Sequence, residues 1–140
     1  MRISKPEARW FEVPGDPDGA RIKVKHLTPG ERQDIYDKTL TQEINYKPDE
    51  KGNLQPMLRQ VANKKEDREK TLTMRVVGWE NVMDAEGKPL ECTSDNVVRA
   101  AREIDGFVEL VNGFAAQLEE DIKTEREAQE KNLSSTPTES

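Results

Sequence analysis

Two short runs of apolar residues lie near the start of the chain, at residues 9–13 and 20–25. In the second run Ile22 and Val24 alternate with basic residues, which is the period-two pattern of a half-buried strand. The residues between the runs are rich in Pro, Gly and Asp and favour a turn. Residues 1–27 are therefore predicted to form a small N-terminal β-hairpin segment, which must pack on another element because an isolated hairpin is marginal in water.

Helical signals begin with Thr28, which is followed three residues later by Glu31. This pair predicts a capping box that opens a helix over about residues 29–40. A second capping signal precedes apolar residues at helical spacing and predicts a helix over about residues 64–80. The residues between these helices, 41–62, have no clear apolar period and contain a polar run with Pro and Gly, so they are predicted to be a mobile loop.

Two further helices are predicted after residue 93. Thr93 or Ser94 is expected to cap a short helix that ends near residue 104. The clearest periodic signal in the chain follows it, with apolar residues at the i, i+3, i+4, i+7 spacing of an amphipathic helix: Phe107, Leu110, Val111, Phe114 and Leu118. Residues 123–140 carry almost no apolar side chains and are predicted to be a disordered tail, and a fraying extension of the preceding helix into its first residues is left open.

The predicted fold is mainly α with a small N-terminal β-hairpin, an α+β arrangement. The hairpin segment covers residues 1–27. A helical domain of about four helices covers residues 28–122, with the mobile loop at about 41–62, and the disordered tail covers 123–140. One modest core is expected, because a chain of 140 residues has room for a single ordinary domain.

Charge and composition narrow the function classes. Charged residues make up 36% of the chain with both signs interspersed, and the net charge of −6 argues against non-specific binding to nucleic acid or to anionic membranes, which require an electropositive face. No stretch approaches the ~18 apolar residues of a membrane span. The first residues lack the apolar core of a signal peptide, and Cys92 is the single cysteine, so a reducing cytosol is expected.

Reactive side chains are few. His26 is the single histidine and lies where a strand gives way to a capped helix, which favours a structural role over a catalytic triad. Cys92 would become a nucleophile only if its position near a helix N-terminus lowered its pKa, and no second feature of a thiol enzyme accompanies it. The chain is therefore expected to be non-enzymatic, with no catalytic residue.

The acidic residues near the turns favour turn chemistry over a cation site. The spacing of Asp84, Glu86 and Gly87 does not match an EF-hand loop, and Asp16 and Asp18 lie in the first predicted turn. The phosphate-binding loop and the dinucleotide fingerprint do not occur in the sequence. No cofactor and no metal are expected.

Apolar side chains are the remaining candidates for a functional surface. Trp10 and Phe11 are neighbours on a predicted edge strand, so one of them must point outward unless another element covers it. Together with the stripe of the last helix they form the predicted partner-binding set: Trp10, Phe11, Phe107, Leu110, Val111, Phe114 and Leu118. The alternative interpretation, that the stripe of the last helix is wholly internal core, stays open. Trp79 can likewise be either a core residue or part of a binding surface.

The run from Val77 to Thr93 resembles a stretch of the phage tail assembly chaperones, in which Gly-Trp-Glu ends a helix and a turn of the form Asp-x-x-Gly-x-Pro-Leu follows. The segment from Leu27 to Glu31 is similar to the helix start that follows the β segment of these proteins. The residues that carry the resemblance are expected to act structurally, as caps, turn and anchor: Thr28, Glu31, Trp79, Gly87, Pro89, Leu90 and Thr93.

The resemblance implies a phage or prophage product that acts in the cytoplasm of the bacterial host. It implies a non-enzymatic, mostly helical protein that binds the tape measure protein, keeps it soluble and is absent from the mature virion. The tail tube protein is a second candidate partner, and self-association into a homo-oligomer is left open. Two other functions also stay open: a different morphogenesis factor, such as a tail completion or head–tail joining protein, and a small acidic inhibitor protein.

Overall fold

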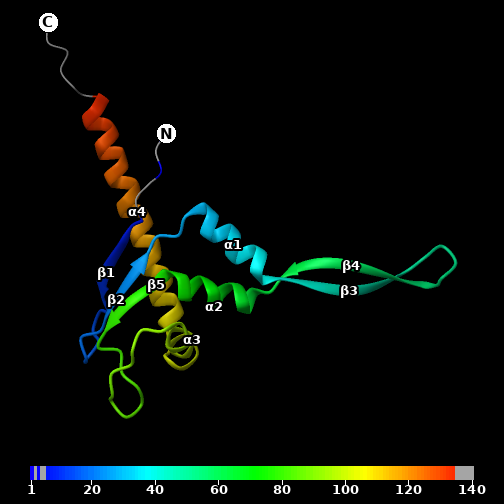
Figure 1. The fold of residues 1–140 in the computed structure, drawn as a ribbon, viewed down its shortest axis with the longest axis horizontal. Helices are drawn as coiled ribbons and strands as arrows, with labels where there is room; N and C mark the ends of the chain where they lie inside the picture. Colours follow the sequence, from blue (N-terminus) through cyan, green and yellow to red (C-terminus); the bar gives the residue numbers. More distant parts are fainter. Residues whose placement is uncertain (2, 4–5, 135–140) are drawn as a thin grey trace, which may run out of the picture. The chain divides into compact units, whose positions relative to one another are not determined.

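The computed structural model describes residues 1, 3 and 6–134, and over this range the chain forms five strands and four helices. Figure 1 shows these elements in chain order. They belong to two compact units. Unit 1 contains Met1–His26 and Thr73–Ser140, and unit 2 contains Leu27–Leu72.

Unit 1 is built on a three-stranded antiparallel sheet. Its strands are β1 (Ala8–Glu12), β2 (Arg21–Lys25) and β5 (Val76–Glu80), in the order β1-β2-β5. The long helix α4 (Phe107–Ser134) packs against β2 (Figure 1), and the shorter helix α3 (Ser94–Glu103) packs against α4.

One face of this sheet forms the core of unit 1. Phe11, Ile22 and Trp79 are directly opposite one another across the three strands, so their side chains share a face. On that face Phe11 stacks on Phe114, and Trp79 meets Phe107 edge to face. The buried apolar residues of the unit are Ala20, Ile22, Val24, Val76, Trp79, Val82, Val97, Ala100, Phe107, Val111, Leu118 and Ile122.

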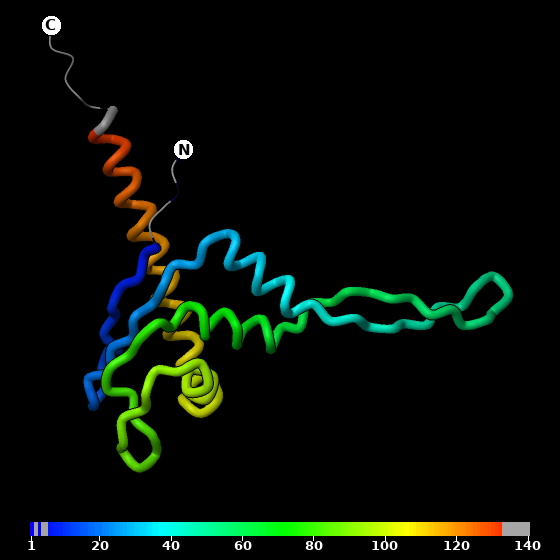
Figure 2. The backbone as a smooth tube through the Cα atoms, viewed as in Figure 1, coloured from blue at the N-terminus to red at the C-terminus, as the bar shows by residue number. Residues whose placement is uncertain are grey.

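Unit 2 contains a second, two-stranded sheet between two helices. Helix α1 (Pro29–Thr39) leads into β3 (Leu40–Pro48), and β4 (Leu54–Ala62) leads into α2 (Lys64–Arg75), whose last residues belong to unit 1. Figure 2 shows the chain running out along β3 and returning beside it along β4. At the base of this hairpin the backbone N–H of Asn63 donates to the carbonyl of Thr39, at 2.9 Å.

The expected helix caps are present. Thr28 and Glu31 form a capping box, in which the Thr28 hydroxyl accepts from the N–H of Glu31 and the Glu31 carboxylate accepts from the N–H of Thr28. The Thr93 side chain accepts from the N–H of Asn96 and caps α3. These bonds satisfy amides that the first turn of a helix leaves without a partner.

The prediction of a mainly α protein with a small N-terminal β-hairpin is wrong. The described residues form an α+β structure with two antiparallel sheets, and β3 and β4 occupy the segment that was expected to be a mobile loop. The helix predicted over 64–80 ends at Arg75, and the next five residues form β5. Helix formation is limited there because Val76 and Val77 are β-branched and Gly78 follows them.

The C-terminal helix is longer than its apolar stripe. Helix α4 continues to Ser134 although residues 123–134 were expected to belong to a disordered tail. Charged and amide side chains with high helix propensity dominate this extension, so a solvated helix can persist without an apolar face. The rest of the predicted tail, residues 135–140, lies outside the described residues.

Candidate partner-binding surfaces

Most of the predicted partner-binding stripe lies in the core of unit 1. Phe107, Val111 and Leu118 are buried, with at most 3% of their surface exposed. The ring centroids of Phe11 and Phe114 are 4.9 Å apart with an interplanar angle of 12°, so these half-buried rings contact each other. Such side chains hold α4 on the sheet and offer little surface to a partner.

Trp10 differs from the rest of the predicted set because it lies on the opposite face of the sheet. It is 38% exposed, and a Cβ added at Gly78 would lie 3.5 Å from its Cη2 atom, so the indole lies over a strand position without a side chain. The guanidinium of Arg21 is 4.9 Å from the ring centroid, and the Lys23 amine is 6.0 Å away. These cations stabilise the exposed ring against the sheet.

Leu110, the last member of the predicted set, is half-buried and lines a cavity of about 220 Å³ in unit 1. This cavity lies where the β1–β2 loop, the residues after β5 and the start of α4 meet. Its walls include Asp16, Asp18 and Asp84 beside apolar side chains.

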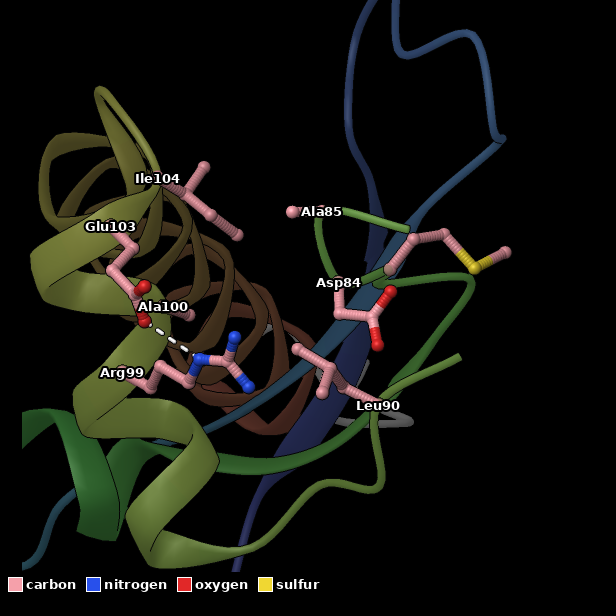
Figure 3. Close-up of a pocket in the computed structure, with 8 residues that line it drawn as sticks. Asp84, Ala85, Leu90, Arg99, Ala100, Glu103 and Ile104 are labelled. Atoms are coloured by element: carbon pink, nitrogen blue, oxygen red, sulfur yellow. Dashed lines mark hydrogen bonds and ion pairs between the residues drawn. The ribbon is translucent and has the colours of Figure 1, made fainter. Parts of the chain in front are cut away.

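A second cavity of unit 1 lies beside the first and has a volume of about 270 Å³. Met83, Asp84 and Ile104 line both cavities. Figure 3 shows Arg99, Glu103 and Ile104 from the end of α3 on one side of the second cavity, and Asp84, Ala85 and Leu90 from the turn on the other. The two adjoining cavities are called the acidic groove below.

Several large apolar side chains of unit 2 are exposed on the β3–β4 hairpin. Residues directly opposite each other on paired strands point to the same side. The register therefore places every even-numbered residue of the hairpin on one face. Four of its large apolar members are 57–70% exposed: Ile44, Tyr46, Leu54 and Leu58. We call these four residues, with Pro48 and Pro56, the apolar hairpin face.

The backbone pairing brings the side chains of this face close together. Thr39 with Asn63 and Asp49 with Asn53 are hydrogen-bonded at the two ends of the ladder. Hydrogen-bonded and non-hydrogen-bonded pairs alternate in an antiparallel ladder, so the even-numbered pairs, such as Ile44 with Leu58, are the non-hydrogen-bonded ones. Side chains approach most closely at such pairs, which makes the apolar hairpin face continuous.

The same alternation explains the two prolines in the hairpin. At a non-hydrogen-bonded position the backbone nitrogen points away from the partner strand, so Pro48 and Pro56 leave the ladder intact. Each proline removes one donor from an outer edge of the hairpin, and Pro56 does so in the middle of β4. Addition of a partner strand to these edges is disfavoured, so the apolar hairpin face is the better docking surface.

The opposite face of the hairpin is mostly polar, although Met57 and Val61 also lie on it. Glu43 is directly opposite Arg59 there, and Thr41, Asn45, Lys47 and Gln55 complete that side. Among the described residues of the two strands, none of the charged ones lies on the apolar hairpin face. Over residues 40–62 three acidic residues balance three basic ones, so this segment is neutral within a chain of charge −6.

Sequence reasoning missed this surface although its signal was present. Ile44 and Tyr46 alternate with polar residues, as do Leu54, Pro56 and Leu58 apart from Met57. The run of turn formers between them is a tight loop, in which the Asp49 carboxylate accepts from the N–H groups of Lys51 and Asn53. A turn flanked by two period-two segments is the pattern of a hairpin.

The residues considered for catalysis are His26 and Cys92. The backbone N–H of His26 donates to the carbonyl of Glu7, which ties the chain after β2 to the start of β1. Burial raises the pKa of the Cys92 thiol, which is opposite to the activation of a nucleophile. Within the described residues no group of three or more His, Cys, Asp and Glu side chains is placed to hold a metal ion.

The acidic turn residues have structural partners. The Asp16 carboxylate accepts from the N–H groups of Asp18 and Ala20, and the Asp84 carboxylate accepts from those of Glu86 and Lys88.

None of the helices in the described part of the chain is long and apolar enough to cross a membrane. A scan of protein-family models and searches of curated proteins and solved structures find no match to this chain.

Proposed function

We propose that this protein is a non-enzymatic phage tail assembly chaperone that binds the tape measure protein and keeps it soluble. The observation that carries the proposal is the apolar hairpin face, which presents Ile44, Tyr46, Leu54 and Leu58 to solvent. Exposed contiguous apolar surface is typical of a protein–protein contact. The sequence resemblance of Val77–Thr93 to tail assembly chaperones supports this class of function over other protein-binding roles, although Gly78, Trp79 and Glu80 end a strand in this protein and not a helix.

The dimensions of the hairpin favour reversible binding. Each strand has nine residues, so one face of the hairpin is about 30 Å long and about 10 Å wide. Docking on it alone would cover about 300 Å² on this chain, which is less than half of the roughly 800 Å² per partner of a standard interface and corresponds to a weak, transient contact. A holding protein that must release its partner needs such a contact, because a large apolar interface would be permanent.

A partner that covers the apolar hairpin face would also stabilise the fold of the hairpin. A two-stranded sheet is marginally stable in water without a third strand or a packed helix. Burying the exposed part of each of the four large side chains would contribute about 1 kcal/mol or more. Binding and ordering of the hairpin would therefore stabilise each other.

The proposed setting is the cytoplasm of the bacterial host during tail assembly. The chaperone would hold the tape measure protein until the tail tube forms, with the tail tube protein as a second contact, and would be absent from the mature virion. Mass spectrometry of purified particles tests the last point. Stoichiometric retention in the particle would point instead to a tail completion or head–tail joining protein.

The direct test is co-expression with a tape measure protein from the genome that encodes this chain. The wild-type protein is expected to raise the soluble fraction of that partner, and the double variant Ile44→Ser/Leu58→Ser is expected to lose the effect. The matched control is Glu43→Ser/Arg59→Ser, which changes the neighbouring pair on the opposite face and leaves the net charge unchanged. The proposal fails if the wild-type protein has no effect, or if both variants behave alike.

A further inference from the structure

We infer that the acidic groove of unit 1 is a second docking site, which binds a basic amphipathic segment of a partner protein. The groove lies in a different unit from the apolar hairpin face and shares no residue with it. The inference is therefore independent of the proposed chaperone function. It rests on the form of the groove, its apolar walls and its charge.

The cavities suit side chains better than a small molecule. The groove consists of two adjoining cavities of about 270 and 220 Å³, and each alone is smaller than the roughly 300–1,000 Å³ of a single small-molecule site, whereas side chains of one segment could occupy both. Met83 and Ile104 line both cavities, so a segment crossing them could place one apolar side chain in each. Ile104 is 40% exposed and Met83 has an adaptable side chain, which suits a surface that receives another protein.

The walls of the groove are apolar at depth. Val82 and Phe107 are buried residues that line one cavity, and Ala100 is a buried residue that lines the other. They belong to the core of unit 1 and are held there by α3, α4 and the sheet. An apolar side chain entering the groove would meet a preformed surface, so little ordering would be required on this side.

Carboxylates dominate the polar part of the groove. Asp16, Asp18, Asp84 and Glu103 line it, whereas Arg99 is its single basic residue. The Nε of Arg99 is paired with Glu103 at 2.7 Å, so its charge is already compensated. The groove therefore carries a net charge of about −3, which favours lysine or arginine on the partner and disfavours a second copy of this acidic chain.

Part of each carboxylate remains available to a ligand. The turn N–H groups donate to Oδ2 of Asp16 and to Oδ1 of Asp84, and the Nε of Arg99 donates to Oε2 of Glu103. The turn hydrogen bonds and the Arg99 pair therefore do not involve the second oxygen of Asp16, Asp84 or Glu103. A basic side chain could pair with these oxygens without breaking the turns.

The test uses two labelled model peptides of equal length, one of Leu and Lys and one of Leu and Glu, each with an amphipathic pattern. Fluorescence anisotropy with the full-length protein measures their affinities. The Leu/Lys peptide is expected to bind at least about tenfold more tightly, and its affinity is expected to fall as salt is added. Equal binding of the two peptides, or no binding of the Leu/Lys peptide, would overturn the inference.

Charge variants locate the site. Asp18→Asn/Asp84→Asn removes two charges from the groove and is expected to weaken Leu/Lys binding about fivefold. The Asp84→Asn change keeps a side-chain oxygen for the turn amides. The control Glu12→Gln/Glu86→Gln changes the net charge equally at exposed positions outside the groove. If the control weakens binding as much, the peptide is attracted by overall charge and the inference is wrong.

Two further measurements separate this inference from the proposed function. The variant Ile44→Ser/Leu58→Ser is expected to bind the Leu/Lys peptide as the wild type does, and a loss of binding would place the peptide on the hairpin. Methyl NMR resonances of Ile104 and Met83 are expected to shift on titration with the peptide. Unchanged resonances at both positions would overturn the groove assignment whatever the variants do.

Discussion

The indole Nε1 of Trp79 donates a hydrogen bond of 2.8 Å to the backbone carbonyl of Leu90. This bond joins β5 to the end of the turn that follows it, across eleven positions of the chain. The backbone supports the same closure, because the N–H of Leu90 donates to the carbonyl of Val82 at 2.8 Å. Trp79 therefore fixes the turn that forms one wall of the acidic groove.

Replacing Trp79 by Phe is expected to destabilise the protein by about 1–3 kcal/mol, because the Leu90 carbonyl loses its donor while an aromatic ring remains. The comparison is Trp10→Phe, at an exposed site, for which a loss below about 1 kcal/mol is expected. Urea unfolding followed by far-UV circular dichroism measures both. Equal losses would mean that the Trp79 hydrogen bond contributes little.

Two Gly→Ala substitutions are expected to change the free energy of unfolding in opposite directions. Gly87 has φ of +79°, so Gly87→Ala places a side chain in the left-handed region and is expected to cost about 1–2 kcal/mol. Gly113 lies inside α4 with open space at the position that a Cβ would take, so Gly113→Ala is expected to add about 0.5–1 kcal/mol. Thermal unfolding of both variants tests the signs, and a stabilising Gly87→Ala would contradict this account of the turn.

Local signals in the sequence predicted the caps and the turn well, whereas β5 was predicted as helix. Val76 and Trp79 are three residues apart, which is a helical spacing, yet both are buried in the sheet of unit 1. In a regular strand, residues three positions apart point to opposite faces. A register shift between Lys23 and Val24 removes this conflict. Val77 is the extra residue of this bulge, so Val76 and Trp79 can face the same side of the strand.

The candidate surfaces were less predictable than the core. The periodicity of the α4 stripe favours core over a binding surface without deciding between them, and the contact of Phe114 with Phe11 shows that this part of it is internal. Pro48 and Pro56 are compatible with strands only at open edges, and whether a strand lies at an edge is a tertiary property that local sequence does not give. The acidic groove combines residues from distant parts of the chain, such as Asp18 and Ile104, which no local pattern connects.

The tip of the hairpin is expected to respond to acid. Hydrogen bonding by the backbone of Asn53, followed by Gln55 and Lys51, lowers the pKa of the Asp49 carboxylate. A lowered folded-state pKa means that the stabilisation is present above the ordinary pKa of Asp and is lost as the pH falls through the lowered value. Amide exchange and chemical shifts of Lys51 and Asn53 are therefore expected to change below about pH 4, and Asp49→Asn is expected to abolish that change.

The Cys92 thiol is expected to react slowly with iodoacetamide near neutral pH, because burial raises its pKa and so reduces the thiolate. The rate should rise when urea unfolds the chain, and glutathione provides the exposed-thiol comparison. A native rate above that of glutathione would indicate an activated thiolate. It would reopen the interpretation of Cys92 as a nucleophile at the start of α3.

Restoring the backbone donor at position 56 is expected to open the edge of β4. In Pro56→Thr the new N–H points away from β3, beside the apolar hairpin face, where it can pair with a strand from another molecule. Sedimentation velocity is expected to show association that increases with protein concentration. Gln60→Thr is the control, since Gln60 is also at a non-hydrogen-bonded position of β4 and already has its N–H. If Pro56→Thr remains as monodisperse as this control, Pro56 does not protect the edge, and a partner strand could add to β4 as readily as a partner could dock on its face.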